Sequence, residues 1–205
     1  DIRSYLEYAF FHMIPRIQDI NQRIQFLDQF TERFPESTLQ GQLNLQYFYA
    51  YRVSNDEPKV IEYGEKAVAA GPGDAATLNI VAEDYAERGK NLGQGTAYAK
   101  KVLELAPTMD RPAHIAEDAW EVTKSAQLGM AHATLGWIQY REGFPSKKLE
   151  PAAESLKTAI ELLAGDPSRL ARTRFRLGYT YASMPATAAN LKRAASVLTE
   201  VATTG

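Results

Sequence analysis

The sequence predicts an all-α protein of about ten helices, paired into hairpins that stack as an α-α superhelix. Three observations predict this class. Apolar residues recur at helical spacing from end to end, and proline or glycine interrupts that pattern at regular intervals. Related segments also return about every 35 residues. A period near 34 residues with two helices in each unit is typical of helical-hairpin repeats.

The segment 149–164 illustrates how each helix is predicted. Its apolar residues follow the i, i+3/i+4, i+7 spacing that places side chains on one helix face. They are Ala152, Ala153, Leu156, Ala159, Ile160 and Leu163. Pro151 lies at its start, where the missing N–H costs nothing. The same reasoning predicts helices, in chain order, over 2–13, 16–34, 38–53, 57–70, 74–89, 94–105, 113–142, 149–164, 168–183 and 187–203.

Aspartate, proline and glycine mark where these helices begin and end. An aspartate side chain accepts hydrogen bonds from the free N–H groups of a first turn, and proline suits the position that follows it. Such starts are Asp56 before Pro58, Asp74, and Asp166 before Pro167. Ends are predicted where proline or glycine follows a periodic segment. These residues are Pro15, Pro35, Pro72, Gly89, Pro107, Gly143 and Pro167.

The spacing of the prolines and of similar segments gives the period of the repeat. Pro35 and Pro72 are 37 residues apart, and Pro72 and Pro107 are 35 apart. The segment Leu-Lys-Thr-Ala at Leu156 returns as Leu-Lys-Arg-Ala at Leu191, after 35 residues. The sequence therefore predicts a repeat array rather than an irregular helical bundle.

These repeats resemble the tetratricopeptide repeat, which has a Leu-Gly/Ala pair and a Tyr on its first helix, small residues on its second and a closing Pro. One unit matches at Leu78, Ala82, Tyr85, Gly89, Ala99, Val102 and Pro107. A later unit matches at Leu135, Gly136, Gly143, Ala152, Leu156 and Ala159, with Gln139 where the family has Tyr. The last matches at Leu177, Gly178, Tyr181, Leu191 and Ala194. The resemblance covers roughly residues 38–203.

The resemblance implies one right-handed solenoid domain over residues 1–205. Its repeats are 38–73, 74–107, 113–167 with an extended first helix, and 168–203, after an irregular N-terminal hairpin over 1–37. In that hairpin, Phe26, Leu27, Phe30 and Phe34, followed by Pro35-Glu36-Ser37, resemble a junction in envelope-associated bacterial repeat proteins. The alternative is simply a helix with an aromatic core face. A bacterial protein of this repeat type is the expectation.

An insertion breaks the period between Pro107 and Leu128. About twenty residues rich in Ala, Glu and Asp extend the next helix backwards. A continuous helix over 113–142 is about 45 Å long at 1.5 Å per residue. Such a helix either protrudes or docks on a neighbouring unit, and Trp120 and Val122 favour docking.

Composition excludes several classes of protein. The chain has 205 residues, enough for a sizeable core, and its 23 basic and 25 acidic residues give a net charge of −2. This balance argues against nucleic acid as a partner. Without cysteine the chain has no disulfide, thiolate zinc site or cysteine nucleophile. Apolar runs such as Tyr8–Phe11 fall far short of the ~20 residues that span a bilayer, so no transmembrane segment is predicted.

The start of the chain and its compartment stay open. The sequence begins at Asp1 rather than Met, so we expect either a removed leader or a start inside a longer protein. The absence of cysteine fits the periplasm or cell envelope and the cytoplasm equally well. The localisation is therefore unknown.

No catalytic, metal-binding or cofactor-binding residues are predicted. The histidines at 12, 114 and 132 have no partners at a spacing that forms a zinc site. Gly93-Gln94-Gly95 lacks the Lys-Ser/Thr of a phosphate-binding loop, and no Gly-x-Ser-x-Gly occurs. The chain is expected not to be an enzyme.

The resemblance implies a concave groove, lined by the first helices, that binds a peptide or partner helix. Its predicted lining is Asn79, Glu83, Met130, Trp137, Tyr140, Arg141, Arg172, Phe175, Arg176 and Tyr179. Arg172 and Arg176 lie one turn apart, so both guanidinium groups are expected to meet a partner's carboxylate, as half of the family's carboxylate clamp does. The alternative is a solvated basic face that also includes Arg169 and Arg174. Six basic residues against two acidic ones over 165–205 favour an acidic partner or a C-terminal carboxylate.

The aromatic run Tyr47, Phe48, Tyr49 and Tyr51 has two interpretations as well. Core packing explains most of these rings, and the remainder either line the groove or cover a dimer contact.

Two functions follow from this sequence. The first is a non-catalytic scaffold or adaptor that binds a partner protein in the groove. The alternative is a structural, self-associating module, as part of a bacterial cell-envelope assembly, that uses the long helix or the helix over 187–203. That last helix is rich in Ala, Leu and Val without a polar outer face, so the chain either continues past Gly205 or forms a homo-oligomer.

Overall fold

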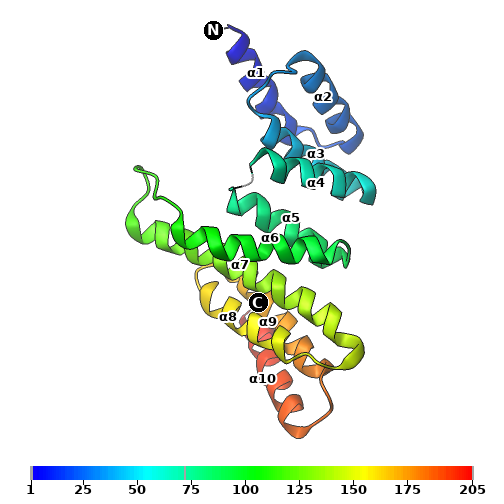
Figure 1. The fold of residues 1–205 in the computed structure, drawn as a ribbon, viewed down its shortest axis with the longest axis vertical. Coiled ribbons are helices and arrows are strands. Elements are labelled where there is room, and N and C mark those ends of the chain that lie inside the picture. The colour runs from blue at the N-terminus through cyan, green and yellow to red at the C-terminus, as the bar shows by residue number, and fades with distance from the viewer. Residues whose placement is uncertain (1, 72, 205) are drawn as a thin grey trace. The chain divides into compact units, whose positions relative to one another are not determined.

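The computed structural model describes residues 2–71 and 73–204, and this part of the chain is all-helical (Figure 1). Ten α-helices pack in neighbouring pairs, 82% of the chain is helix, and the described residues form no strand. The all-α prediction and the number of helices are confirmed. No helix in the described part combines the length and the apolar character needed to cross a membrane.

The chain divides into two compact units, Asp1–Thr77 and Leu78–Gly205. The boundary falls near the start of helix α5 (Ala75–Arg88), within the predicted repeat 74–107. The prediction of one continuous repeat domain stays a prediction, and the two units are described separately.

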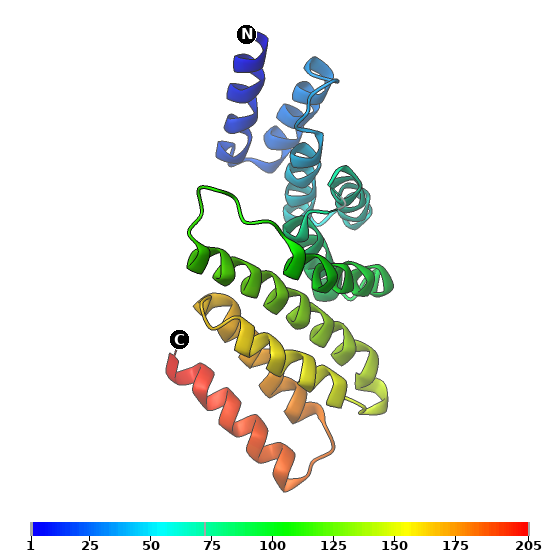
Figure 2. The same ribbon diagram turned by 60° about the vertical axis from the view of Figure 1, so that its left-hand side comes forward.

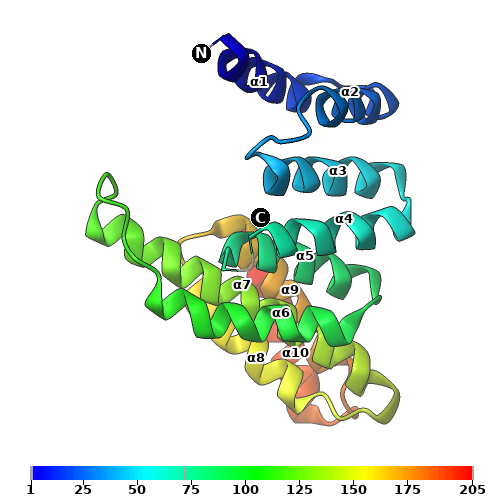
Figure 3. The ribbon, with the colours of Figure 1, turned by 45° about the horizontal axis from the view of Figure 1, so that its top comes forward.

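The first unit consists of two helical hairpins (Figure 3). Its helices are α1 (Ile2–Met13), α2 (Ile20–Arg33), α3 (Gln40–Ser54) and α4 (Glu57–Ala70). The helix predicted from residue 16 begins instead at Ile20. Pro15 lies in a 3-10 turn over Ile14–Arg16, and the Asp19 carboxylate then accepts the N–H of Gln22 and starts α2.

Aromatic side chains from three helices form the core of the first unit. Phe10 of α1 stacks on Phe26 of α2 at 4.8 Å between ring centroids, and Phe30 is fully buried. In the aromatic run of α3, Tyr47 and Phe48 are buried while Tyr49 and Tyr51 are half-buried. Core packing therefore accounts for part of that run, and Tyr49 is left partly accessible.

The second unit continues with α5 and five further helices. These are α6 (Leu92–Leu105), α7 (Glu117–Gly143), α8 (Glu150–Leu162), α9 (Pro167–Ser183) and α10 (Ala188–Thr204). Each helix from α6 to α9 packs against the next one along the chain (Figure 2). At the start of α9, the Asp166 carboxylate accepts the N–H of Arg169 at 3.0 Å, as the predicted helix start requires.

Glycines bring the second unit's helices into close contact. A Cβ on Gly136 of α7 would lie 2.7 Å from Cγ of Leu156, and one on Gly178 of α9 would lie 2.6 Å from Cγ of Leu198. Real Cβ contacts are longer, so each leucine fills the space that a side chain on the glycine would take. A small residue against a large one lets the two helices of each pair approach closely.

The long helix begins later than predicted. α7 starts at Glu117 rather than residue 113, so its 27 residues span about 40 Å rather than 45 Å. A turn that includes a hydrogen bond from the N–H of Ile115 to the Pro112 carbonyl precedes it. Trp120 is buried and α7 contacts the 3-10 turn Ala106–Thr108, which favours docking of the helix start over protrusion. Val122, the other residue of that prediction, is exposed.

Candidate partner-binding surface

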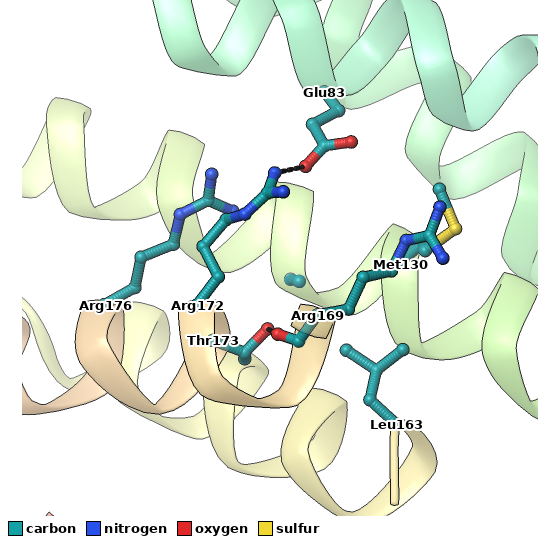
Figure 4. Close-up of a pocket in the computed structure, with 8 residues that line it drawn as sticks. Glu83, Met130, Leu163, Arg169, Arg172, Thr173 and Arg176 are labelled. Carbon is teal, nitrogen blue, oxygen red and sulfur yellow. Dashed lines mark hydrogen bonds and ion pairs between the residues drawn. The ribbon is translucent and has the colours of Figure 1, made fainter. Parts of the chain in front are cut away.

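Two ion pairs join α5 to α9 in the second unit. Arg172 donates from Nη1 to Glu83 Oε1 at 2.7 Å, and Arg176 donates from Nη2 to Glu87 Oε1 (Figure 4 shows the first pair). The two glutamates lie four residues apart on α5, and the two arginines lie four apart on α9. Because that spacing places side chains on one face, the pairs form successive rungs between the helices.

The two rungs differ in their exposure to solvent. The Arg172 side chain is 50% exposed, whereas that of Arg176 is 6% exposed. Burial lowers the pKa of Arg176, and the nearby Glu87 and Glu83 carboxylates oppose that shift. A guanidinium stays protonated at physiological pH, so Arg176 is a buried cation that needs its counter-charge.

Trp137 and Arg141 of α7 extend this junction. The guanidinium carbons of Arg141 and Arg176 lie 5.5 Å and 5.2 Å from the centroid of the Trp137 ring, which is cation–π distance. Arg141 also donates from Nη2 to the Glu87 carbonyl oxygen at 2.5 Å. That carbonyl lies in the last turn of α5, where a cation is favourable. Side chains from α5, α7 and α9 therefore meet around Trp137.

Five rings form a continuous patch beside this junction, which we call the aromatic surface. Its members are Trp137, Tyr140, Phe144, Phe175 and Tyr179. Tyr140 lies 4.7 Å from Trp137, 5.5 Å from Phe144 and 5.5 Å from Tyr179 between ring centroids, and Phe175 lies 6.3 Å from Tyr179. Phe175, Tyr179 and Phe144 remain 52%, 46% and 41% exposed, so the outer side of the patch is open.

Tyr140 anchors the aromatic surface to the unit. It is buried, and its hydroxyl lies 3.2 Å from Ser183 Oγ at hydrogen-bond distance. Burial is the main reason that the pKa of Tyr140 is raised. The ring is therefore neutral and held in place, and it supports the more exposed Tyr179 and Phe144.

The structure places the predicted groove residues in two groups. Asn79 and Met130 are buried, and Asn79 donates from Nδ2 to the carbonyl oxygen and to Oε1 of Gln127 at 3.0 Å and 2.7 Å. The other eight gather at the aromatic surface and the adjoining ion pairs: Glu83, Trp137, Tyr140, Arg141, Arg172, Phe175, Arg176 and Tyr179. The expectation of two arginines open to a partner's carboxylate needs correction, because Glu83 and Glu87 already pair with them.

Two residues of this site were not predicted from the sequence. Glu83 and Glu87 are four residues apart, as are Arg172 and Arg176. This matching spacing in the sequence is a signal from which Glu87 could have been predicted. Phe144 lies just beyond Gly143, in a 3-10 turn past the predicted end of the helix. No helical periodicity includes it.

The space beside the arginines is small. A cavity of about 10 Å³ is lined by Glu83, Met130, Arg172 and Arg176, among others (Figure 4). That volume corresponds to roughly one water molecule. The paired arginines therefore connect helices rather than line a ligand-sized pocket. No group of three or more potential metal ligands occurs among the described residues.

No protein-family model matches this chain, and no curated protein matches it.

Proposed function

We propose that the Leu78–Gly205 unit is a protein-interaction module that holds an apolar segment of a partner protein on the aromatic surface, without catalysis. The observation that carries this proposal is the exposure of Phe175, Tyr179 and Phe144 on a support of buried or half-buried rings. Aromatic side chains and arginine are enriched where proteins bind one another, and exposed apolar patches mark such sites. The resemblance to tetratricopeptide repeats points to the same class of function.

The ion pairs favour an apolar segment over an acidic one. An incoming carboxylate would have to displace Glu87 from Arg176. The partner's carboxylate would then be paired, but the carboxylate of Glu87 would lose its partner. Exchanging counter-charges around a buried cation brings little net gain. Apolar side chains on Phe175 and Tyr179 would instead remove exposed ring surface from water without disturbing either pair.

The size of this gain sets the strength of the interaction. Covering the exposed halves of two rings removes roughly 200 Å² of apolar surface, which is worth about 5 kcal/mol at 25 cal/mol per Å². Association itself costs about 4–15 kcal/mol. The rings therefore act as anchors, and contacts around them supply the remaining affinity.

Capture by variants of the whole chain tests this proposal. The bait carrying Phe175→Ser and Tyr179→Ser is compared with wild type and with a control carrying Val122→Ser and Leu191→Ser. Both control residues are exposed to a similar degree but lie outside the aromatic surface. Soluble and membrane fractions of the source cells are used separately. A partner retained by wild type and control but lost by the double ring variant supports the proposal. Equal retention by all three baits contradicts it.

Arginine variants would be a poor test of the same surface. Arg176 is buried and paired, so its substitution changes folding together with binding. The ring variants avoid this difficulty, because both side chains are about half exposed.

A structural role through self-association is the second candidate. Leu191 of α10 is 54% exposed, and Ala195 and Ala202 on the same side of the helix are exposed as well. A second copy that packs on this side would cover them. Sedimentation velocity at tens of micromolar should then give a dimer or larger species that Leu191→Lys dissociates. A monomer at that concentration contradicts this candidate.

A further inference from the structure

Helix α1 of the first unit is apolar on two opposite sides. Phe10 and Phe11 pack into the aromatic core from one side, where α1 lies beside α2 (Figure 3). On the other side Ile2, Leu6 and Met13 are 80%, 43% and 50% exposed. A helix that is apolar all round is usually buried on every side. The outer side of α1 therefore has the character of a contact surface.

The exposed residues have the spacing of a helix-pairing seam. What we call the α1 seam consists of Ile2, Leu6, Ala9 and Met13. These residues are separated by four, three and four positions, which is the a/d spacing of a coiled coil. That spacing keeps all four on one face of the helix. Tyr5 and His12, both exposed, lie along one edge of the seam.

The α1 seam is complementary to a second copy of itself in antiparallel orientation. A two-fold axis between positions 7 and 8 places Ile2 opposite Met13 of the second copy, and Leu6 opposite Ala9 of the second copy. A large side chain then meets a small one on both sides of the axis, which allows close packing. The positive N-terminal end of each helix also lies beside the negative C-terminal end of the other.

The exposed area of the seam matches what a weak dimer needs. Together with Tyr5 and His12, the seam exposes roughly 600 Å² in each copy, so a pair would bury about 1,200 Å². This area is at the lower limit for specific protein interfaces. We therefore expect association in the micromolar range rather than a permanent dimer.

The charge of the first unit disfavours a membrane as the cover of this seam. Residues 1–77 include eleven acidic and seven basic residues, a net charge of −4. Such a unit is repelled by the anionic surface of a lipid bilayer. The seam itself contains no lysine or arginine that would offset this repulsion.

We propose that two copies of this chain associate through the α1 seam, with the two α1 helices antiparallel. The contact uses the first unit alone. It is independent of the aromatic surface and of Leu191 on α10, the residue invoked for the other self-association candidate.

Sedimentation equilibrium of the whole chain, up to several hundred micromolar, measures this association. Leu6→Lys places a charge in the centre of the seam and should weaken association about tenfold. Val53→Lys and Leu191→Lys introduce the same charge at exposed apolar residues outside the seam. Both controls should associate as wild type does.

Reciprocal charges test the antiparallel register. Ile2→Glu and Met13→Lys should each weaken association about tenfold. The chain carrying both changes should recover most of it, because each glutamate then faces a lysine of the second copy. Within one chain the two positions lie about 16 Å apart along the helix and cannot pair. An acidic residue at the start of α1 and a basic one at its end also favour the helix, which circular dichroism checks.

Several results would overturn the proposal. A wild-type chain that stays monomeric does so, and flotation of that monomer with phosphatidylserine vesicles would show that the seam binds lipid instead. Association that Leu191→Lys abolishes and Leu6→Lys does not would place the contact on α10. A double charge variant no better than the single ones would contradict the antiparallel pairing. The Phe175→Ser, Tyr179→Ser chain should associate as wild type does, which separates this proposal from the proposed function.

Discussion

Glu87 of α5 and Arg176 of α9 form an ion pair between residues that are 89 positions apart in the sequence. The guanidinium is buried and lies against the Trp137 ring, while Arg141 of α7 donates to the carbonyl of the same glutamate. One residue pair thus connects three helices and lies beside the aromatic surface.

Breaking this pair should destabilise the protein far more than breaking its exposed neighbour. Glu87→Gln leaves a buried cation without its counter-charge, which costs about 3–5 kcal/mol of the free energy of unfolding. Glu83→Gln frees the half-exposed Arg172, and such pairs are worth at most about 1 kcal/mol. Urea unfolding of both variants checks the difference, and equal losses would contradict the assignment of Arg176 as a buried cation.

Enlarging Gly178 should destabilise the second unit through overpacking. A side chain there collides with Leu198, so Gly178→Val should cost about 1–3 kcal/mol and lower the melting temperature. Gly93 of α6 is the control, because a Cβ there meets no heavy atom within 4 Å. Gly93→Ala should raise stability by up to about 1 kcal/mol. An unchanged melting temperature for Gly178→Val would argue against the close approach of α9 and α10.

His132 should make stability fall as the pH falls. Burial lowers the pKa of this imidazole, so the folded chain takes up its proton less readily than the unfolded chain does. The stability it contributes is present above the unfolded pKa of about 6.5 and is lost as the pH falls through the folded pKa.

Stability measured from pH 8 to pH 5 checks this prediction. His132→Gln should reduce the loss of stability over that range, whereas the same change at the exposed His114 should leave the loss as it is in wild type. A pH dependence unaltered by His132→Gln would mean that other groups cause it.

Ser37 should be needed for the stability of the first unit. It is buried, donates a hydrogen bond from Oγ to Glu7 of α1, and accepts the N–H of Leu39 at 3.0 Å. Ser37→Ala removes both bonds and should cost about 1–3 kcal/mol. The control is Ser54, whose hydroxyl donates to the Tyr51 carbonyl at the surface. Ser54→Ala should lower the free energy of unfolding by less than half as much as Ser37→Ala does. Calorimetric unfolding of the two variants measures the difference, and similar losses would contradict the structural role of Ser37.

Local sequence signals predicted most of the fold. Asp56 and Asp166 were predicted to start helices, and each accepts the N–H of the residue three positions later. The start of α7 was predicted too early because Ala113 and Ala116, just before it, favour a helix in isolation. Contacts within that segment decide otherwise, including the hydrogen bond from the Arg111 guanidinium to the Ile115 carbonyl.

Most residues of the candidate site were predicted, but the ion pairs that join its helices were not. The resemblance to the repeat family placed Trp137, Tyr140 and Tyr179 together in the predicted groove lining, and their rings do meet. The partners of Arg172 and Arg176 could not be found in the same way. An ion pair across 89 residues depends on how α5 and α9 are placed, which local periodicity does not specify.

Photo-crosslinking from the aromatic surface tests directly whether a partner protein binds there. The photoreactive amino acid p-benzoylphenylalanine is placed at Tyr179, or at Leu191 as a similarly exposed control, and the chain is irradiated in its source cells. The proposed function predicts a crosslinked partner from position 179 that position 191 does not give, and that Phe175→Ser weakens. Crosslinks that are the same from both positions, or none from position 179, would contradict binding at this surface.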